Sequence, residues 1–324
     1  MNILFCSVGR RAELLKNFRK SMGKEGRIIA TDLSNTAPAL YFADAFYLVP
    51  PISDENYINV ILNICRKEHI QAITTCIDPE IMLLAQHRKE FEELGVLVLT
   101  PTLETAKICF DKYKMYHYLT QCGVPTVRTY GDFDSFCKGF EAQEIAFPAF
   151  VKPRTGSGSV GARKVFSIGE LREAFLGDPS LIVQEYMGDA MDLDADAYID
   201  TVSHETVAVF TKKKLETKIG GANKTVSFRD ANMVRFLVDA LKHFQFNGPI
   251  DVDVFCRDGE YYLSEINPRF GGAYLHAYGA GVDFVKMIQN NVNGIANQTE
   301  LMQYEEGIAM LMYDSVVICQ LKNE

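Results

Sequence analysis

Residues 262–272, with the sequence YLSEINPRFGG, constrain the fold and chemistry of this chain more than any other segment. They are typical of a strand, and a strand turns every second side chain to the same face. Glu265, Asn267 and Arg269 are therefore expected to point into one space. Carboxylate and amide oxygens bind a hard cation such as Mg²⁺, and a guanidinium binds phosphate. The segment predicts a site for a metal ion bridged to phosphates.

A partner strand is expected at residues 251–255, joined through the loop 257–259. The length of this loop decides which side chains share a face. A two-residue turn pairs Val252 with Glu265 and puts Asp253 on the opposite face. A three-residue loop ending in a left-handed glycine, a common hairpin type, pairs the first residue of the partner strand with Glu265 instead.

We prefer the three-residue loop because it separates polar from apolar side chains. It gathers Asp253, Glu265 and Asn267 on one face. The apolar face then consists of Val252, Val254, Tyr262 and Ile266. The alternative is a surface hairpin whose acidic face is solvated, since short motifs also match by chance.

Composition limits the classes of protein to consider. The chain has 324 residues and 36.4 kDa, which is enough for two or three modest domains. A net charge of −9 argues against a protein that grips nucleic acid, because phosphate backbones need a basic field. No apolar run approaches the length of a membrane span, so neither nucleic acid nor a membrane is an expected partner.

The eight cysteines form no Cys-x-x-Cys pair and lie mostly in apolar stretches. They are typical of reduced core residues, which favours a cytoplasmic location. The apolar start of the chain is followed at once by Gly9-Arg10-Arg11, so we interpret it as a first strand and not as a signal peptide.

The first hundred residues alternate strands and helices. Strands are expected at 3–6, 28–31, 45–49, 72–76 and 96–99, with helices at 10–20, 57–68 and 79–93. This pattern predicts an open, mostly parallel, doubly wound sheet. A nicotinamide-binding oxidoreductase is the alternative, but Gly9 is a single glycine where the dinucleotide fingerprint has three. We instead interpret Asp32 as a strand-end residue near a cleft or as part of a turn.

A boundary near residues 100–110 precedes a helix that Asp111 can cap and Lys112 can open. A smaller α+β unit follows, with strands at 124–130, 149–152, 163–166 and 181–185 and helices at 133–142 and 167–176. We expect three domains, at residues 1–109, 110–187 and 188–324.

Lys152 stands on a strand that leads into a glycine-rich loop, whose small residues are Gly156, Ser157, Gly158, Ser159 and Gly161. Backbone N–H groups of such a loop can close on phosphate oxygens, and the lysine adds a point charge. The lysine precedes the glycines and a strand follows them, so this is not a Walker loop. A mobile hairpin tip is the alternative interpretation.

The apolar strand at 181–185 runs into a segment that can offer main-chain hydrogen bonds to an adenine. Its residues are Gln184, Glu185, Tyr186 and Met187. A simple core strand is the alternative. Asp192, Asp194 and Asp196 then alternate along the next strand, and three like charges on one face favour an exposed edge or a site.

These motifs, in this order, resemble the ATP-grasp family. The resemblance covers residues 110 to about 295 and rests on Lys112, Lys152 before the glycine-rich loop, Gln184–Met187, Asp253, and Glu265-x-Asn267-x-Arg269. The first hundred residues resemble the domain that precedes ATP-grasp in biotin carboxylase and carbamoyl-phosphate synthase. The resemblance implies a mixed α/β and α+β fold, in which a Rossmann-like parallel sheet precedes a small lid subdomain and a larger antiparallel subdomain.

The resemblance also implies roles for individual residues. Lys112 and Lys152 correspond to the lysines that hold the α- and β-phosphates of ATP, and the loop 156–161 to the lid over them. Glu185 and Met187 match the hinge that receives the adenine edge, and Asp192 an acidic residue near the ribose. The implied Mg²⁺ (or Mn²⁺) ligands are Asp253, Glu265 and Asn267, and Arg269 lies beside the reacting γ-phosphate.

The resemblance implies an ATP-dependent carboxylate–amine ligase that works through an acyl phosphate. One ATP-grasp unit, with lysines at 112 and 152 where carbamoyl-phosphate synthase tends to carry arginines, favours a stand-alone ligase. The expected partners are a small carboxylate and an amine or ammonia, and a homodimer is the candidate assembly. A non-catalytic nucleotide-binding subunit or sensor is the alternative.

Three further features are left open by the sequence. Lys212–Lys214 and Lys218 either steer an anionic substrate or stabilise the acyl phosphate, or they form a solvated charge run. His276 follows Gly271-Gly272 and is either structural or near the substrate.

Overall fold

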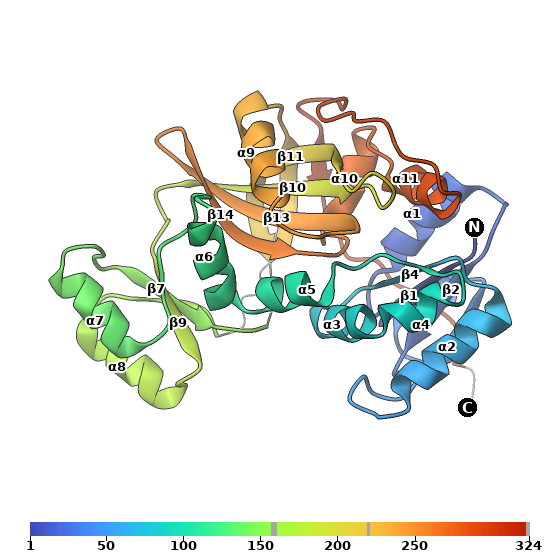
Figure 1. Ribbon diagram of the computed structural model, residues 1–324, viewed down its shortest axis with the longest axis horizontal. Helices are drawn as coiled ribbons and strands as arrows, with labels where there is room; N and C mark the ends of the chain where they lie inside the picture. The colour runs from blue at the N-terminus through green and yellow to red at the C-terminus, as the bar shows by residue number, and fades with distance from the viewer. Residues whose placement is uncertain (157–160, 219–220, 322–324) are drawn as a thin grey trace.

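The computed structural model describes residues 1–156, 161–218 and 221–321. Ser157, Gly158, Ser159 and Gly220 therefore lie outside the described residues. Three sheets lie side by side along the long axis of the molecule (Figure 1). None of the described helices is both long and apolar enough to cross a membrane.

The N-terminal part is the parallel, doubly wound sheet that the sequence predicts. Its order is β3-β2-β1-β4-β5, and every pairing is parallel. The strands are β1 (Ile3–Cys6), β2 (Ile28–Asp32), β3 (Ala45–Leu48), β4 (Ala72–Thr75) and β5 (Leu97–Val98). The chain order reverses between β1 and β4, which is where ligands bind in open sheets of this kind.

Helices and one 3₁₀ turn surround this sheet. They are α1 (Ala12–Met22), η1 (Pro38–Phe42), α2 (Tyr57–Glu68), α3 (Asp78–Gln86) and α4 (Arg88–Glu92). The single helix expected at 79–93 is thus two helices that meet at His87. Helix α1 packs against the C-terminal part of the chain, and the rings of Phe18 and Phe270 meet edge to face at 5.4 Å.

Two consecutive helices link this sheet to the next unit. They are α5 (Leu103–Phe110), which was not predicted, and α6 (Lys112–Gln121). Thr102 caps α5, and Asp111 caps α6 by accepting from the backbone N–H groups of Tyr113 and Lys114. The predicted role of Asp111 is confirmed.

A small antiparallel sheet forms the far end of the molecule (Figure 1). Its order is β6-β9-β7-β8, with strands β6 (Thr129–Tyr130), β7 (Ala149–Pro153), β8 (Arg163–Val165) and β9 (Leu181–Glu185). Helices α7 (Phe133–Glu141) and α8 (Ile168–Gly177) pack on it. The strand expected at 124–130 is shorter, since only its last two residues are in β6.

The central sheet is antiparallel throughout and has the order β14-β13-β10-β11-β12-β15. Its strands are β10 (Met191–Ile199), β11 (Thr206–Lys218), β12 (Gly221–Ser227), β13 (Gly248–Arg257), β14 (Glu260–Asn267) and β15 (Ala309–Leu311). The remaining helices are α9 (Ala231–Leu241), α10 (Tyr274–Gly279) and α11 (Phe284–Val292). Apolar side chains from one face of this sheet pack against α9, so the opposite face is available for a site.

The hairpin of β13 and β14 differs from the predicted register. Its turn has two residues, Asp258 and Gly259, both with positive φ (54° and 82°), as in a type I′ turn. The predicted pairing of Asp251 with Glu265 is wrong, because Asp251 lies opposite Asn267 and Asp253 opposite Glu265.

A bulge in β14 explains why the predicted face is kept although the predicted register is not. The register shifts at Ser264, and this extra residue returns Asp253, Glu265 and Asn267 to one face. The predicted face is thus correct, although the expected loop length is not. Tyr262 was assigned to the apolar face, but it pairs with Phe255 on the site face, and Leu263 packs in the core instead.

Candidate functional site

The floor of the site is a row of charged side chains that crosses four strands. Lys212 of β11 lies opposite Asp194 of β10, which lies opposite Asp253 of β13, which lies opposite Glu265 of β14. Because side chains alternate along each strand, the next layer on the same face pairs Asp196 with Asp251.

Two lysines neutralise much of this negative charge. Nζ of the buried Lys212 lies 3.1 Å from Asp194 Oδ1 and donates to Asp196 Oδ2. Burial lowers the pKa of Lys212, but the two carboxylates outweigh burial and hold this pKa above its usual value. Nζ of Lys214 lies 2.9 Å from Asp192 Oδ1 and also donates to Asp253.

The open interpretations of the lysine run are therefore resolved in part. Lys212 and Lys214 form ion pairs in the floor of the site, so a solvated run is wrong for both. Lys213 alternates to the other face, where its ammonium lies 5.2 Å from the ring of Phe228.

Oxygens suited to a hard cation face one another at the edge of this floor. The carboxylates of Asp253 and Glu265 lie on paired residues, and the amide of Asn267 follows on the same face. Ammonium groups adjoin both carboxylates, since Lys214 contacts Asp253 and Lys112 Nζ lies 3.6 Å from Glu265 Oε1. These carboxylates thus already attract cations, and their oxygens with the amide oxygen of Asn267 are donors of the kind that Mg²⁺ prefers.

Asn267 is needed to complete that set. Among the described residues, no three His, Cys, Asp or Glu side chains are grouped so that they could hold a metal ion. Two carboxylates and one amide are therefore the donors that the structure offers.

Two lysines from different elements interact electrostatically with Glu265. Lys112 opens α6 and donates to the carbonyl of Gly156. Lys152 lies on β7, and burial lowers its pKa; Glu265 and Asp253 oppose this effect, and Lys112 adds to it. Gly156 and Gly161, which flank residues 157–160, both have positive φ, at 98° and 76°.

The segment expected to receive an adenine lies at the end of β9. The side chain of Gln184 is buried and donates to Thr129 Oγ1 at 2.8 Å. Glu185 accepts from Arg257 Nη2 at 2.6 Å. The segment borders a hollow whose lining includes Phe147, Pro148, Glu185, Tyr186, Asp189 and Arg257. Met187 is buried, whereas Asp192 keeps 41% of its side chain exposed.

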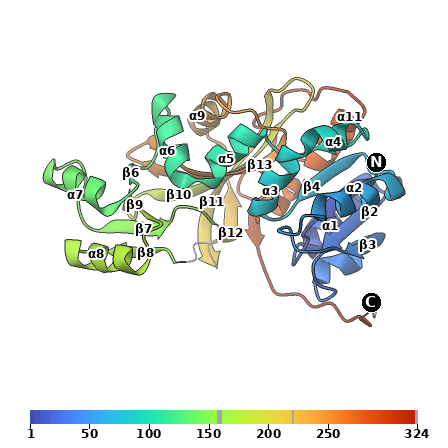
Figure 2. The same ribbon diagram turned by 60° about the horizontal axis from the view of Figure 1, so that its bottom comes forward.

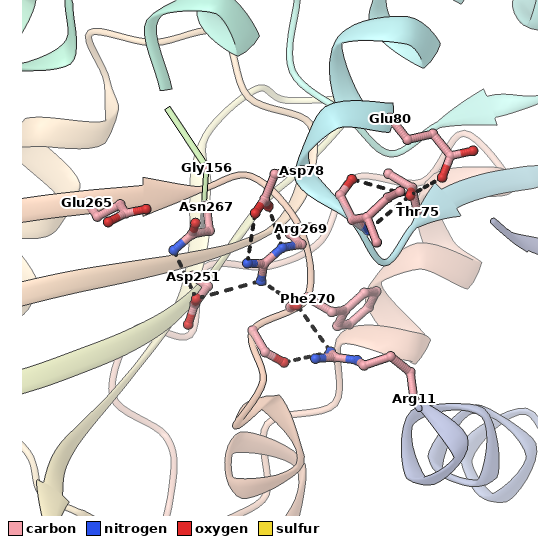
Figure 3. Close-up of polar contacts among 12 residues, drawn as sticks. Arg11, Thr75, Asp78, Glu80, Gly156, Asp251, Glu265, Asn267, Arg269 and Phe270 are labelled. Carbon is pink, nitrogen blue, oxygen red and sulfur yellow. Dashed lines mark hydrogen bonds and ion pairs between the residues drawn. The ribbon is translucent and has the colours of Figure 1, made fainter. Parts of the chain in front are cut away.

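Arg269 is held by carboxylates from two parts of the chain (Figure 3). Its Nε donates to Asp78 Oδ1 at 2.6 Å, and its Nη1 lies 3.9 Å from Asp251 Oδ2. Asn267 Nδ2 donates to the same Asp251 oxygen at 3.3 Å. Burial, together with Asp194, Asp253 and Asp196, raises the pKa of Asp251 well above its usual value.

Asp78 and Asp251 were not predicted as site residues. Asp251 could have been found, because it shares the strand face of Asp253. Asp78 follows β4 at the carboxyl edge of the parallel sheet, which is only a general signal. A narrow cavity between α3, α5 and β14 joins Asp78 to the predicted metal ligands, and Lys112, Glu265 and Asn267 also line it.

The order and placement of these motifs agree with a comparison with known families. A family model described as an ATP-grasp domain matches residues 109–273, just over half of the chain. The chain belongs to the ATP-grasp family. A second model, described as a PylC-like N-terminal domain, matches residues 3–99.

Curated relatives are distant from this ATP-grasp chain. A pyruvate carboxylase subunit from Methanothermobacter thermautotrophicus is 22% identical over 310 residues, covering 88% of this chain and 62% of the relative. D-alanine–D-alanine ligase of Lactococcus lactis is 26% identical over 197 residues, covering 54% of this chain and 56% of the relative. The chain thus spans less than two thirds of the length of either relative.

Solved structures share the fold over almost the whole chain. N5-carboxyaminoimidazole synthetase from Staphylococcus aureus with ADP gives a TM-score of 0.72 at 17% identity, covering 92% of this chain and 78% of the other. The biotin carboxylase domain dimer of 2-oxoglutarate carboxylase from Hydrogenobacter thermophilus, with MgADP and bicarbonate, gives 0.71 at 18%, covering 94% and 71%. At these identities the likeness concerns the fold alone.

His276 has a structural place in this ATP-grasp chain. It is 2% exposed, its Nδ1 is 2.7 Å from Thr225 Oγ1, and its Nε2 is 2.9 Å from the carbonyl oxygen of Ile308. Burial lowers the pKa of His276 to about 4. The ring is therefore neutral at pH 7 and holds β12 to the segment before β15.

Proposed function

We propose that this chain is an ATP- and Mg²⁺-dependent carboxylate–amine ligase that works through an acyl phosphate. One observation carries the proposal: the Lys112 ammonium lies 3.6 Å from the carboxylate of Glu265, beside Asp253 and Asn267, and the same two carboxylates also act on the charge of Lys152. Phosphate-binding cations and metal-binding oxygens thus meet in one space. Similar folds solved with ADP, one of them with magnesium, support a nucleotide at this place.

The site addresses the electrostatic problem of such a reaction, in which a carboxylate approaches an anionic γ-phosphate. Asp253, Glu265 and Asn267 would hold Mg²⁺ (or Mn²⁺), which neutralises and aligns phosphates when bound. Lys112 and Lys152 lower the charge of the α- and β-phosphates. Arg269 would offset the charge that moves with the γ-phosphoryl group.

The proposed reaction has two steps. A carboxylate oxygen attacks the γ-phosphorus, the bond to the β-phosphate oxygen breaks, and ADP leaves. The amine nitrogen then attacks the acyl carbon, and inorganic phosphate leaves with the electron pair of the acyl–oxygen bond. The products are an amide, ADP and phosphate, and the amine loses one proton.

The rest of the nucleotide site is proposed from the family pattern. We assign the adenine edge to the backbone of Gln184–Met187, the ribose to Asp192 and the phosphate lid to residues 156–161. We also propose domains at residues 1–109, 110–187 and 188–324, and a homodimer as the assembly. A similar fold described as a dimer supports the homodimer, which light scattering would test.

Hydroxylamine trapping tests the ligase. With MgATP and a panel of carboxylic acids, we expect at least one acid to give ADP, phosphate and a hydroxamate, because hydroxylamine replaces the natural amine at the acyl phosphate. Formation of AMP and pyrophosphate would overturn the mechanism. Tight MgATP binding without turnover of any acid would favour a nucleotide-binding subunit or sensor instead.

A further inference from the structure

Two guanidinium groups meet at one carbonyl oxygen where the N-terminal sheet joins the central sheet. Arg11 Nη2 donates to the carbonyl of Phe270 at 3.1 Å, and Arg269 Nη1 donates to the same oxygen at 3.2 Å (Figure 3). The two arginines come from opposite ends of the chain. Like charges this close need compensation from nearby anions.

The compensation is unequal between the two arginines. Arg269 is bound by Asp78 through Nε and Nη2 and lies near Asp251 through Nη1. Arg11 forms no ion pair with any described residue, and the hydrogen bonds of its guanidinium to described residues go only to the carbonyls of Phe270 and Gly271. Burial lowers the pKa of Arg11, and Asp251 and Asp196 oppose this effect from beyond ion-pair distance, so the direct partners of its guanidinium are neutral carbonyls.

Arg11 also has donors to spare. Its Nε is buried and finds no acceptor among the described residues. A Cβ added at Gly272 would meet only Arg11 Nη1, at 4.0 Å, so there is room for a small group over this glycine beside the guanidinium. A buried donor without a partner costs free energy, and an anion would satisfy it.

The position of Arg11 suits an anionic ligand for a second reason. It is the residue before α1, at the carboxyl end of β1, next to the reversal of strand order between β1 and β4. No side chain caps α1, so the positive end of its dipole adds to the guanidinium. Shared packing of α1 with α10 and α11, in which Phe18 contacts Phe270, holds Arg11 beside the site.

We propose that Arg11 binds an anionic group, a carboxylate or a phosphate, that one of the two ligase substrates carries in addition to its reacting group. The proposal rests on the proposed function and deepens it. A substrate would extend from the reacting centre at Arg269 to an anion site at Arg11. The substrate class is then an acid or an amine with a second negative charge.

Calorimetry tests the site without turnover. Protein saturated with Mg²⁺ and the β,γ-imido analogue of ATP is titrated with succinate and, separately, with inorganic phosphate, so that the γ-phosphate position is already filled. We expect saturable binding of at least one probe, and Arg11→Gln should weaken it by about tenfold or more, as for loss of a charge-assisted contact. Arg11→Lys should restore part of the affinity.

The matched control is Arg10→Gln, which removes the same charge from the exposed neighbouring residue. It should bind the probes as the unaltered protein does. Absence of saturable binding, or equal affinities for the Arg11 and Arg10 variants, would overturn the proposal. If the ATP analogue does not bind at all, the proposed function fails, whereas titration of the free protein still tests Arg11.

Paired substrates then assign the anion to one reactant. Succinate is compared with butyrate as the acid, and glycine with ethylamine as the amine, by ADP release. We expect the charged member of one pair to have the higher kcat/KM. Arg11→Gln should remove that advantage, because it should lower the kcat/KM of the charged member more than that of the neutral member. A variant that only loses a contact between domains would lower Tm and slow both members equally, which would contradict the proposal.

Discussion

Asp78, the first residue of α3, accepts a hydrogen bond of 2.6 Å from Nε of Arg269 across 191 positions of sequence. Nη2 of the same guanidinium donates to Asp78 Oδ2 at 3.5 Å, so the contact is bidentate. Both side chains are only 15% exposed, which strengthens the pairing. The N-terminal sheet thus orients the arginine that we place at the γ-phosphate.

Loss of the Asp78 carboxylate should therefore slow the reaction without weakening nucleotide binding. We expect Asp78→Asn to lower kcat by about tenfold and to leave the Kd of MgATP within about twofold, because Arg269 would lose its orientation and not its charge. Rates of ADP release and calorimetry measure the two effects. Glu104→Gln, which removes an exposed carboxylate from α5, is the control, and equal kcat values for the two variants would contradict this role.

Arg269 itself should be required for turnover and not for binding. We expect Arg269→Ala to lower kcat by about a hundredfold or more while the Kd of MgATP changes little, since its charge matters most as the γ-phosphoryl group transfers. Arg229→Ala, which removes an exposed arginine paired with Glu306, is the control. Strong loss of MgATP affinity in Arg269→Ala would place this residue on the ground-state nucleotide instead.

Much of this architecture could be predicted because local patterns determine it. The buried β1 and β2, the capping residue Asp111 and the Glu265-x-Asn267 alternation all depend on side chains within a few residues. The hairpin register could not be obtained in this way. Ser264 forms a bulge that no local sequence pattern predicts. Because of this extra residue, Tyr262 and Glu265 lie on the same face of the sheet.

Contacts between distant segments were also beyond the sequence. In the sequence, Lys212 and Lys214 are typical of a solvated charge run. In the structure they form ion pairs with Asp194 of β10 and Asp253 of β13. The pairing of Asp78 with Arg269 joins the start of α3 to the segment after β14, a long-range contact that no periodicity reveals. The segment after β15 extends past the N-terminal sheet (Figure 2), and the sequence did not predict this path either.

Lys152 should contribute to the affinity for nucleotide. We expect Lys152→Ala to weaken MgATP binding by about tenfold or more, because a charge-assisted contact contributes roughly 1.5–3 kcal/mol. Calorimetry measures the two dissociation constants. Lys138→Ala removes an exposed lysine from α7 in the same unit and should have no effect. Unchanged affinity in Lys152→Ala would remove this lysine from the phosphate site.

His276 should make stability depend on pH. The pKa of His276 in the folded state, about 4, lies below the value in the unfolded state. Its contribution to the free energy of unfolding is therefore fully present above about pH 6.5 and is lost as the pH falls toward 4. Between pH 7.5 and 5 we expect the free energy of unfolding to drop by about 2 kcal/mol through this residue. Denaturant titrations of the unaltered protein, His276→Asn and the exposed control His204→Asn measure it. A drop of the same size in His276→Asn would contradict the assignment.

Glu265 should govern the metal requirement. Its carboxylate lies opposite Asp253 and 3.6 Å from the Lys112 ammonium, so Glu265→Gln removes one negative charge from the predicted metal site and preserves side-chain size. We expect the Mg²⁺ concentration for half-maximal ATP turnover to rise by about tenfold or more, as a charged ligand becomes neutral. The Tm should change by only a few degrees, because the carboxylate is partly exposed. Glu260→Gln, at the exposed start of β14, is the control. A rise of equal size in both variants, or none in Glu265→Gln, would show that the metal is held elsewhere.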